Sequence, residues 1–205
     1  MLILITGGSG SGKSAFAESC VCAGAYKERF YLATMQPFDI ESKNRISRHR
    51  RMREGKKFHT LEQYTGLENV FLPDTGNAAG IRDRIVLLEC MSNLTANEMF
   101  SPEGYGQGHT AEELRHHILD GVRHIEAQCA CMVIVTNEIF SDGIEYPAQT
   151  RAYQQLLGEI NCALAKRADE VYEVVSSIPV LLKKSAAGTA AGRVPDHFMP
   201  AGNTE

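Results

Sequence analysis

The sequence predicts an α/β protein in which a mostly parallel sheet is covered by helices on both faces. Apolar runs that suit buried strands alternate with segments of helical composition from the N-terminus to about residue 182. Such alternation is typical of strand–helix–strand units. A chain of 205 residues can fill one hydrophobic core, with little left for a second. We therefore expect one domain over residues 1–184, followed at 185–205 by a non-periodic tail that is mobile or used at a subunit contact.

The first half of the chain is expected to contain two strands and two helices. Residues 1–6, MLILIT, are apolar and lead into a glycine-rich loop, which indicates a buried strand and not a secretion signal. Residues 13–22 follow the loop as a helix, and residues 29–34 are an apolar strand. Residues 39–53 have helical composition, but NRISRHRRMR within them has only two apolar residues. This helix can therefore bury little of itself.

The second half continues the alternation. Continuous apolar runs again indicate buried strands, and segments with one apolar side indicate amphipathic helices. The two final strands are close enough in sequence to pair antiparallel. The predicted elements are the strand 85–90, the helix 111–128, the strand 132–136, the helix 150–167 and the strands 170–175 and 179–182.

The loop after the first strand carries a phosphate-binding motif. Residues 7–14 read GGSGSGKS and match G-x-x-x-x-G-K-[ST]. Glycines let backbone N–H groups surround a phosphate, and the helix that follows adds its N-terminal dipole. Lys13 can reach the β- and γ-phosphates, and the Ser14 hydroxyl can ligate Mg²⁺. The predicted nucleotide site comprises Gly7, Gly8, Ser9, Gly10, Ser11, Gly12, Lys13 and Ser14.

Glu89 lies at the end of the strand predicted at 85–90. An acidic residue at this place in P-loop proteins often orients Mg²⁺ or its water. Glu89 and Ser14 are therefore the predicted metal residues, although a strand-end carboxylate in solvent is the alternative. The guanine-reading motif Asn-Lys-x-Asp of switch GTPases is absent from the sequence, which counts against a switch.

The helix predicted at 39–53 carries a cationic stripe. Residues 43–57 contain eight Lys or Arg and one acid, so this stretch has a charge of +7 while the rest of the chain has −11. Arg45, His49 and Arg53 are spaced by four residues and share one side of a helix. Arginines bind phosphate oxygens, and a neutral histidine can attack phosphorus. From the residues alone, a solvated basic helix or a nucleic-acid patch is an equal alternative.

The composition also argues against a membrane protein, a disulfide-bonded protein and a histidine metal site. The longest apolar runs are far shorter than a membrane span. The six cysteines include no C-x-x-C pair, which favours reduced thiols and a cytoplasmic protein. His116, His117 and His124 fall on the helix predicted at 111–128, and we expect packing or surface roles for them and not metal binding.

Taken together, the motifs resemble the bifunctional adenosylcobinamide kinase / adenosylcobinamide-phosphate guanylyltransferase family of cobalamin biosynthesis. The resemblance runs from Leu2 to about Lys183, and the order and spacing of its motifs are more specific than any one of them. The matching segments are ILITGG with SGKS and FAE, YLAT at 31–34, Asp39-x-Glu41, the R-I-x-x-H-R segment at 45–50, Thr60-x-Glu62, LLEC at 87–90 with Asn97, VTNE at 135–138, Arg151, Gly158, Asn161, ADEV at 168–171 and Ile178-Pro179.

The resemblance implies a RecA-like P-loop NTPase fold, a homotrimer and two reactions. The enzyme would phosphorylate the hydroxyl of adenosylcobinamide, a corrinoid, and would then transfer GMP from GTP to the new phosphate through a histidine–GMP intermediate. ATP and GTP would be substrates, with Mg²⁺ as the metal. By motif position His49 would be the nucleophile. The further residues implied to contact nucleotide are Ala33, Thr34, Met35, Arg50, Arg51, Met52, Arg53, Glu62 and Glu89.

Two segments depart from the family pattern. Gly8-Ser9-Gly10 stands where the family has G-x-R, and the loop after Asn137-Glu138 is one residue longer. One alternative is therefore a single-activity small-molecule kinase that uses the basic helix only as a phosphate clamp. Another is a nucleic-acid-binding ATPase, which the acidic net charge and the scarcity of aromatic residues in the patch disfavour, so we expect no nucleic-acid partner.

Overall fold

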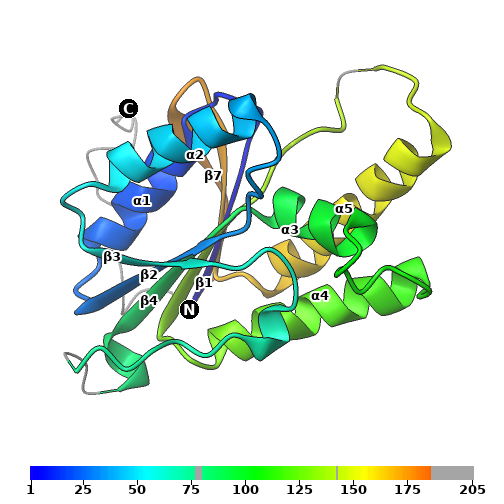
Figure 1. Ribbon diagram of the computed structural model, residues 1–205. Helices are drawn as coiled ribbons and strands as arrows, with labels where there is room; N and C mark the ends of the chain where they lie inside the picture. The colour runs from blue at the N-terminus through cyan, green and yellow to red at the C-terminus, as the bar shows by residue number, and fades with distance from the viewer. Residues whose placement is uncertain (77–79, 142, 186–205) are drawn as a thin grey trace.

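The computed structural model describes residues 1–76, 80–141 and 143–185, which form a seven-stranded sheet flanked by helices (Figure 1). The order of strands across the sheet is β3-β2-β4-β5-β1-β6-β7. All neighbours pair in parallel except β6 and β7, which are antiparallel as predicted. The strands are β1 (Leu2–Thr6), β2 (Glu28–Ala33), β3 (Phe58–Glu62), β4 (Arg84–Glu89), β5 (Cys131–Val135), β6 (Glu170–Val175) and β7 (Ile178–Lys184). The predicted α/β class is confirmed, whereas the predicted tail lies outside the described residues apart from Ser185.

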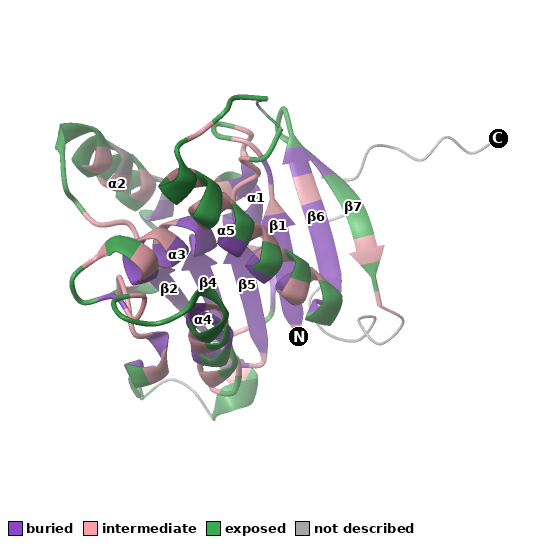
Figure 2. Cartoon of the chain, turned by 90° about the vertical axis from the view of Figure 1, so that its right-hand side faces the viewer, coloured by how far each residue is buried: buried purple, intermediate pink, exposed green. Residues whose placement is uncertain are grey.

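Helices cover both faces of the sheet, and the alternation of side chains along each strand explains how. Ile3 and Ile5 of β1 pack with α1, whereas Leu2 and Leu4 pack in the cluster on the opposite face. Helices α1 (Lys13–Ala23) and α2 (Ile40–Arg53) lie on one side, and α3 (Met91–Phe100), α4 (Ala111–Glu126) and α5 (Ala148–Arg167) lie on the other (Figure 1). The central strands are buried on both faces, as Figure 2 shows. Short 3₁₀ turns occur at Leu67–Asn69 and Ile81–Asp83.

The strand order brings the predicted motifs to one edge of the sheet. In a parallel sheet the carboxyl ends of all strands meet at the same edge, where ligands bind. The phosphate loop follows β1, residues 34–39 follow β2, and Cys90 follows β4. Strand β5 lies between β1 and β4, so the ends of these three strands lie side by side at this edge. No helix in the described part of the chain is both long and apolar enough to cross a bilayer.

Candidate active site

A cavity of about 630 Å³ opens at the carboxyl edge of the sheet. The phosphate loop, the side of α2 and the ends of β2, β3, β4 and β5 contribute its walls. The structure therefore brings together motifs that are far apart in the chain, as the contact between Ser14 and Glu89, 75 residues apart, shows. The predicted site residues in this wall are Ser9, Gly10, Ser11, Gly12, Lys13, Ser14, Ala33, Met35, His49, Arg50, Arg53, Glu62 and Glu89.

Four predicted residues do not line the cavity. Gly7 lies behind it, where a Cβ atom would come within 2.5 Å of the Val174 carbonyl oxygen. Gly8 contributes a carbonyl to the loop, and Arg51 is exposed to solvent. Thr34 is fully buried, and its hydroxyl donates to the Cys90 carbonyl and accepts from the Cys90 N–H, which ties the end of β2 to the end of β4. The side chains of Met52 and Arg45 lie outside the described parts of the structure.

The phosphate loop has the backbone conformation that its glycines permit. Gly10 and Gly12 have φ of 73° and 91°, which side chains rarely adopt. A Cβ on Gly12 would also come within 2.7 Å of Ser177 Oγ. Helix α1 begins at Lys13, so its N-terminal N–H groups face the cavity. Lys13 Nζ donates to the Gly8 carbonyl at 2.9 Å, which folds this cation back over the loop.

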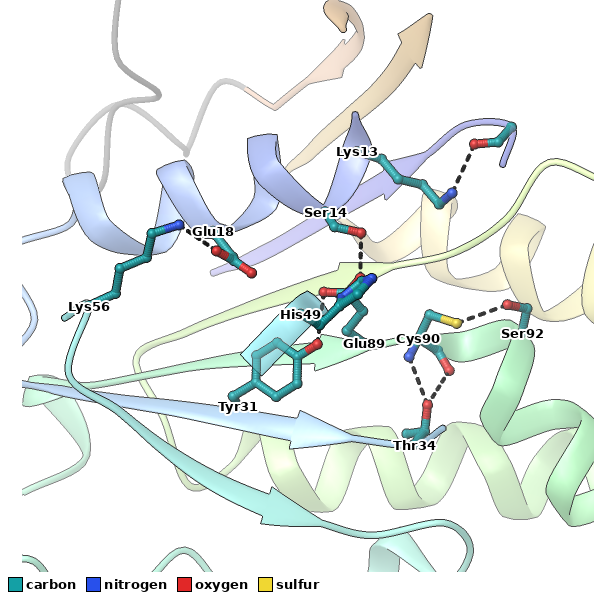
Figure 3. A network of polar contacts seen from close by, with 11 residues as sticks. Lys13, Ser14, Glu18, Tyr31, Thr34, His49, Lys56, Glu89, Cys90 and Ser92 are labelled. Atoms are coloured by element: carbon teal, nitrogen blue, oxygen red, sulfur yellow. Dashed lines mark hydrogen bonds and ion pairs between the residues drawn. The ribbon is translucent and has the colours of Figure 1, made fainter. Parts of the chain in front are cut away.

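Glu89 is the centre of the polar contacts in the cavity (Figure 3). The Ser14 hydroxyl donates to Glu89 Oε1, and His49 Nδ1 lies 3.3 Å from the same oxygen. The Tyr31 hydroxyl donates to Oε2 at 3.1 Å. Burial alone would raise the pKa of Glu89, but the contacts from His49, Ser14 and Tyr31 lower it below its usual value. Glu89 is therefore an ionised acceptor that links the phosphate loop to His49 of α2.

A second group of contacts holds the C-terminal end of α2. The Arg53 guanidinium lies over the Tyr31 ring, with Cζ 3.5 Å from the ring centroid. Beyond it, Lys56 Nζ pairs with Glu18 Oε2 at 2.5 Å, and Glu18 is completely buried (Figure 3). Three of these residues were not predicted from the sequence as site residues: Tyr31, Glu18 and Lys56. The available signal was that Glu18 lies four residues, and therefore one helical turn, after Ser14.

The rim of the cavity carries a third contact group. Arg50 Nη2 pairs with Glu62 Oε1, and the Tyr64 hydroxyl donates to Glu62 Oε2 at 3.1 Å. Glu62 ends β3, so this pair joins the last turn of α2 to the edge of the sheet. On the opposite wall, Asn137 Nδ2 donates to Ser92 Oγ at 2.6 Å. Neither wall residue, Asn137 or Asn93, was predicted as a site residue.

Ser14 and Glu89 also meet the requirements of the predicted metal. Mg²⁺ prefers oxygen ligands and is usually held by one or two protein groups together with nucleotide phosphates. The Ser14 hydroxyl and the Glu89 carboxylate lie in direct contact at the base of the phosphate loop. Within residues 1–76, 80–141 and 143–185 there is no group of three or more His, Cys, Asp or Glu that could hold a metal ion by itself. The two residues therefore fit a magnesium ion that binds with a nucleotide.

The chain is similar to known proteins over nearly its whole length. Residues 3–182 match the family described as "Cobinamide kinase / cobinamide phosphate guanyltransferase". The chain is 32% identical to the "Bifunctional adenosylcobalamin biosynthesis protein CobU" of Escherichia coli (strain K12) over 192 residues, which are 89% of this chain and 100% of that protein. It is 32% identical to the protein of the same name from Salmonella typhimurium, again over 89% of this chain and 100% of the relative.

A third relative is more distant. The chain is 27% identical to the "Bifunctional adenosylcobalamin biosynthesis protein CobP" of Pseudomonas aeruginosa, over 88% of this chain and 96% of that protein. The family match spans nearly all of the described residues, from β1 into β7, and therefore includes every wall of the cavity. On these matches, this chain belongs to the cobinamide kinase / cobinamide phosphate guanyltransferase family.

Proposed function

We propose that this protein phosphorylates adenosylcobinamide and then transfers GMP from GTP to adenosylcobinamide phosphate through a covalent His49–GMP intermediate. The observation that carries the proposal is that the phosphate loop and His49 line one cavity and contact one carboxylate oxygen, Oε1 of Glu89. A nucleotide held by the loop would thus lie beside a histidine. The family match and the names of the relatives support both activities.

The phosphate loop would bind the triphosphate in both reactions. Its N–H groups and Lys13 would hold the β- and γ-phosphates. Mg²⁺, held by Ser14 and Glu89, would supply charge neutralisation at the phosphates. For the kinase step the protein needs only to place the acceptor hydroxyl in line with the γ-phosphate, because phosphoryl transfer is catalysed mainly by positioning and electrostatics.

The guanylyl step needs a nucleophile, and the geometry supports His49 in that role. A proton on Nδ1 would be donated to Glu89 Oε1, which leaves the lone pair on Nε2. Nε2 would attack the α-phosphorus of GTP, the N–P bond would form, and the P–O bond to pyrophosphate would break with its electron pair leaving on pyrophosphate. The Nδ1–H contact to Glu89 would then stabilise the positive charge on the imidazole.

The remaining features of the proposal come from the family resemblance. The acceptor would be a corrinoid, ATP and GTP would be the nucleotide substrates, and the enzyme would work as a homotrimer. A cytoplasmic location is supported by the six cysteines, all of which are free thiols.

The proposal is tested with GTP labelled at the α-phosphate. The wild type should acquire label that survives base and is lost in acid, as P–N bonds are, with an equal amount of pyrophosphate and a mass increase of one GMP. His49→Asn should lose the label and the guanylyl transfer together. Its kinase activity should partly survive, because the phosphate loop and metal residues remain.

Two results would contradict the proposal. Label on the His49→Asn variant would assign the nucleophile to another residue. A wild type with active kinase chemistry but no label would identify a single-activity kinase, in which α2 is only a phosphate clamp. His49→Asn is preferable to His49→Ala because it keeps a polar side chain in a wall that also contains Arg53.

A further inference from the structure

The arginines of α2 have distinct environments, although they belong to one short basic segment of the sequence. Arg48 and Arg50 are exposed at the cavity rim, and Arg50 is paired with Glu62. Arg51 is exposed and lies outside the cavity wall. Arg53 alone among these four is buried, with 8% of its surface accessible, and it also lines the cavity. A buried cation at a cavity wall calls for a specific explanation, because charged groups are rarely buried without a partner.

The Arg53 guanidinium is oriented but not neutralised. Its plane is held over the Tyr31 ring, where cation–π attraction fixes its position. Its Nη1 nitrogen is buried and makes no hydrogen bond within the described part of the chain. The nearby carboxylates have other partners, since Glu18 pairs with Lys56, and Glu89 accepts from Ser14 and Tyr31. Such a guanidinium suits an anionic ligand that enters the cavity.

The position of Arg53 indicates which part of the ligand it would bind. Arg53 lies one helical turn after His49 on the same side of α2. It lies over the Tyr31 ring. The Tyr31 hydroxyl contacts Glu89, and Glu89 contacts His49 (Figure 3). Arg53 and His49 therefore flank one Tyr31–Glu89 unit, whereas Lys13 lies on the phosphate loop and contacts Gly8. Lys13 and Arg53 therefore occupy separate positions in the cavity wall, one at the loop and one beside His49.

We infer that Arg53 is a catalytic residue of the guanylyl step, in which it binds the phosphoryl group that His49 receives, and that the kinase step depends on it much less. The inference rests on the proposed function. As His49 Nε2 bonds to the α-phosphorus and pyrophosphate departs, negative charge grows on the non-bridging oxygens, and Arg53 N–H groups stabilise it. The same contacts hold the phosphoryl group when an oxygen of the acceptor phosphate attacks and the N–P bond breaks. The γ-phosphate has its own cation in Lys13.

The test separates the two half-reactions. Arg53→Gln, Arg53→Lys and the control Lys43→Gln are compared in the single-turnover rate of His49 labelling and, separately, in ATP-dependent kinase turnover. Lys43 is an exposed cation of the same helix outside the cavity, so its substitution removes the same charge from α2. We expect labelling to slow about 10²-fold in Arg53→Gln and less in Arg53→Lys, since removal of one preorganised donor has effects of this size. Kinase turnover should fall much less than labelling in the two Arg53 variants. Lys43→Gln should label normally and keep its kinase turnover within about twofold.

Several outcomes would overturn the inference. Normal labelling of Arg53→Gln would remove Arg53 from the reaction, and an equal loss of labelling and kinase turnover would make it a general or structural residue. Kinase turnover in the same preparation also reports whether the variant has folded. If Arg53→Gln does not fold, Arg53→Lys decides by the same comparison, because it keeps the charge and loses the planar fork. A wild type that never labels would instead refute the proposed function.

Discussion

At the level of single residues, Glu89 connects the phosphate loop to α2. Its Oε1 is shared by Ser14, a residue of the phosphate loop, and by His49, a residue of α2, and its Oε2 is held by Tyr31. Three donors around one buried carboxylate fix its orientation and keep it ionised. Loss of this charge should therefore affect metal-dependent catalysis before it affects the fold.

We predict that Glu89→Gln raises the Mg²⁺ concentration needed for half-maximal kinase activity and lowers catalysis more than nucleotide affinity. The amide keeps the shape of the side chain but removes the negative charge that Mg²⁺ prefers. Activity is titrated with Mg²⁺, and nucleotide binding is measured by calorimetry. Glu62→Gln is the matched control, because Glu62 lines the same cavity but pairs with Arg50 at the rim. An unchanged magnesium dependence together with lost GTP binding would assign Glu89 to base or ribose recognition instead.

At the level of elements, α2 is attached to the protein mainly through polar contacts. Its side chains meet the sheet through His49–Glu89, Arg50–Glu62 and the stacking of Arg53 on Tyr31. With few apolar residues to bury, the helix depends more than the others on its own termini. Asp39 caps its first turn: Oδ1 accepts from Ser42 N–H at 2.7 Å, and Ser42 Oγ accepts from Asp39 N–H at 3.0 Å.

We predict that Asp39→Ala destabilises α2 by about 1 kcal/mol, the usual effect of losing an N-cap. Amide hydrogen exchange of residues 40–53 should speed up, and His49 labelling should slow, because this helix positions His49, the proposed nucleophile. Asp39→Asn is the control, since asparagine also caps well and should keep both properties near those of the wild type. Unchanged exchange in Asp39→Ala would show that the tertiary contacts of α2 hold its first turn without the cap.

Two elements of the fold, β3 and α3, were not predicted from the residue pattern. Strand β3 was not predicted because it is a short edge strand whose five residues are mostly exposed, so FHTLE has no continuous apolar run. It becomes a strand through its parallel pairing with β2. Helix α3 was not among the elements predicted from the residue pattern, because its ten residues are too few for a clear period.

At the level of the whole molecule, one cavity serves both proposed reactions, and the edge hairpin has apolar side chains in solvent. Val175, Ile178, Val180 and Leu182 of β6 and β7 are each more than 40% exposed. Exposed apolar residues on an edge strand are a common feature of subunit contacts. They are compatible with the oligomer that the family resemblance implies.

We predict that the protein in solution has three times the 22.6 kDa mass of one chain. Light scattering after size-exclusion chromatography measures this directly. Val180→Lys, which places a charge on the exposed hairpin face, should reduce the trimer fraction if this face is buried between subunits, whereas Lys43→Gln on α2 should leave it unchanged. A monomer at all concentrations tested would contradict the prediction.

The sequence by itself determined the α/β class, the phosphate loop, the order of most elements and the resemblance to the family. These features depend on local patterns: apolar runs, glycine and lysine at fixed spacing, and motif order. The tertiary structure alone decided which basic residues of α2 enter the cavity and which do not. It buried Arg53 over Tyr31 and left Arg51 in solvent, although the two are only two residues apart. It also placed His49 and Ser14 on one oxygen of Glu89, a contact that spans up to 75 residues. Helical spacing fixes which side chains share a face, but the direction of that face depends on strand order and packing, and these are set by the whole chain.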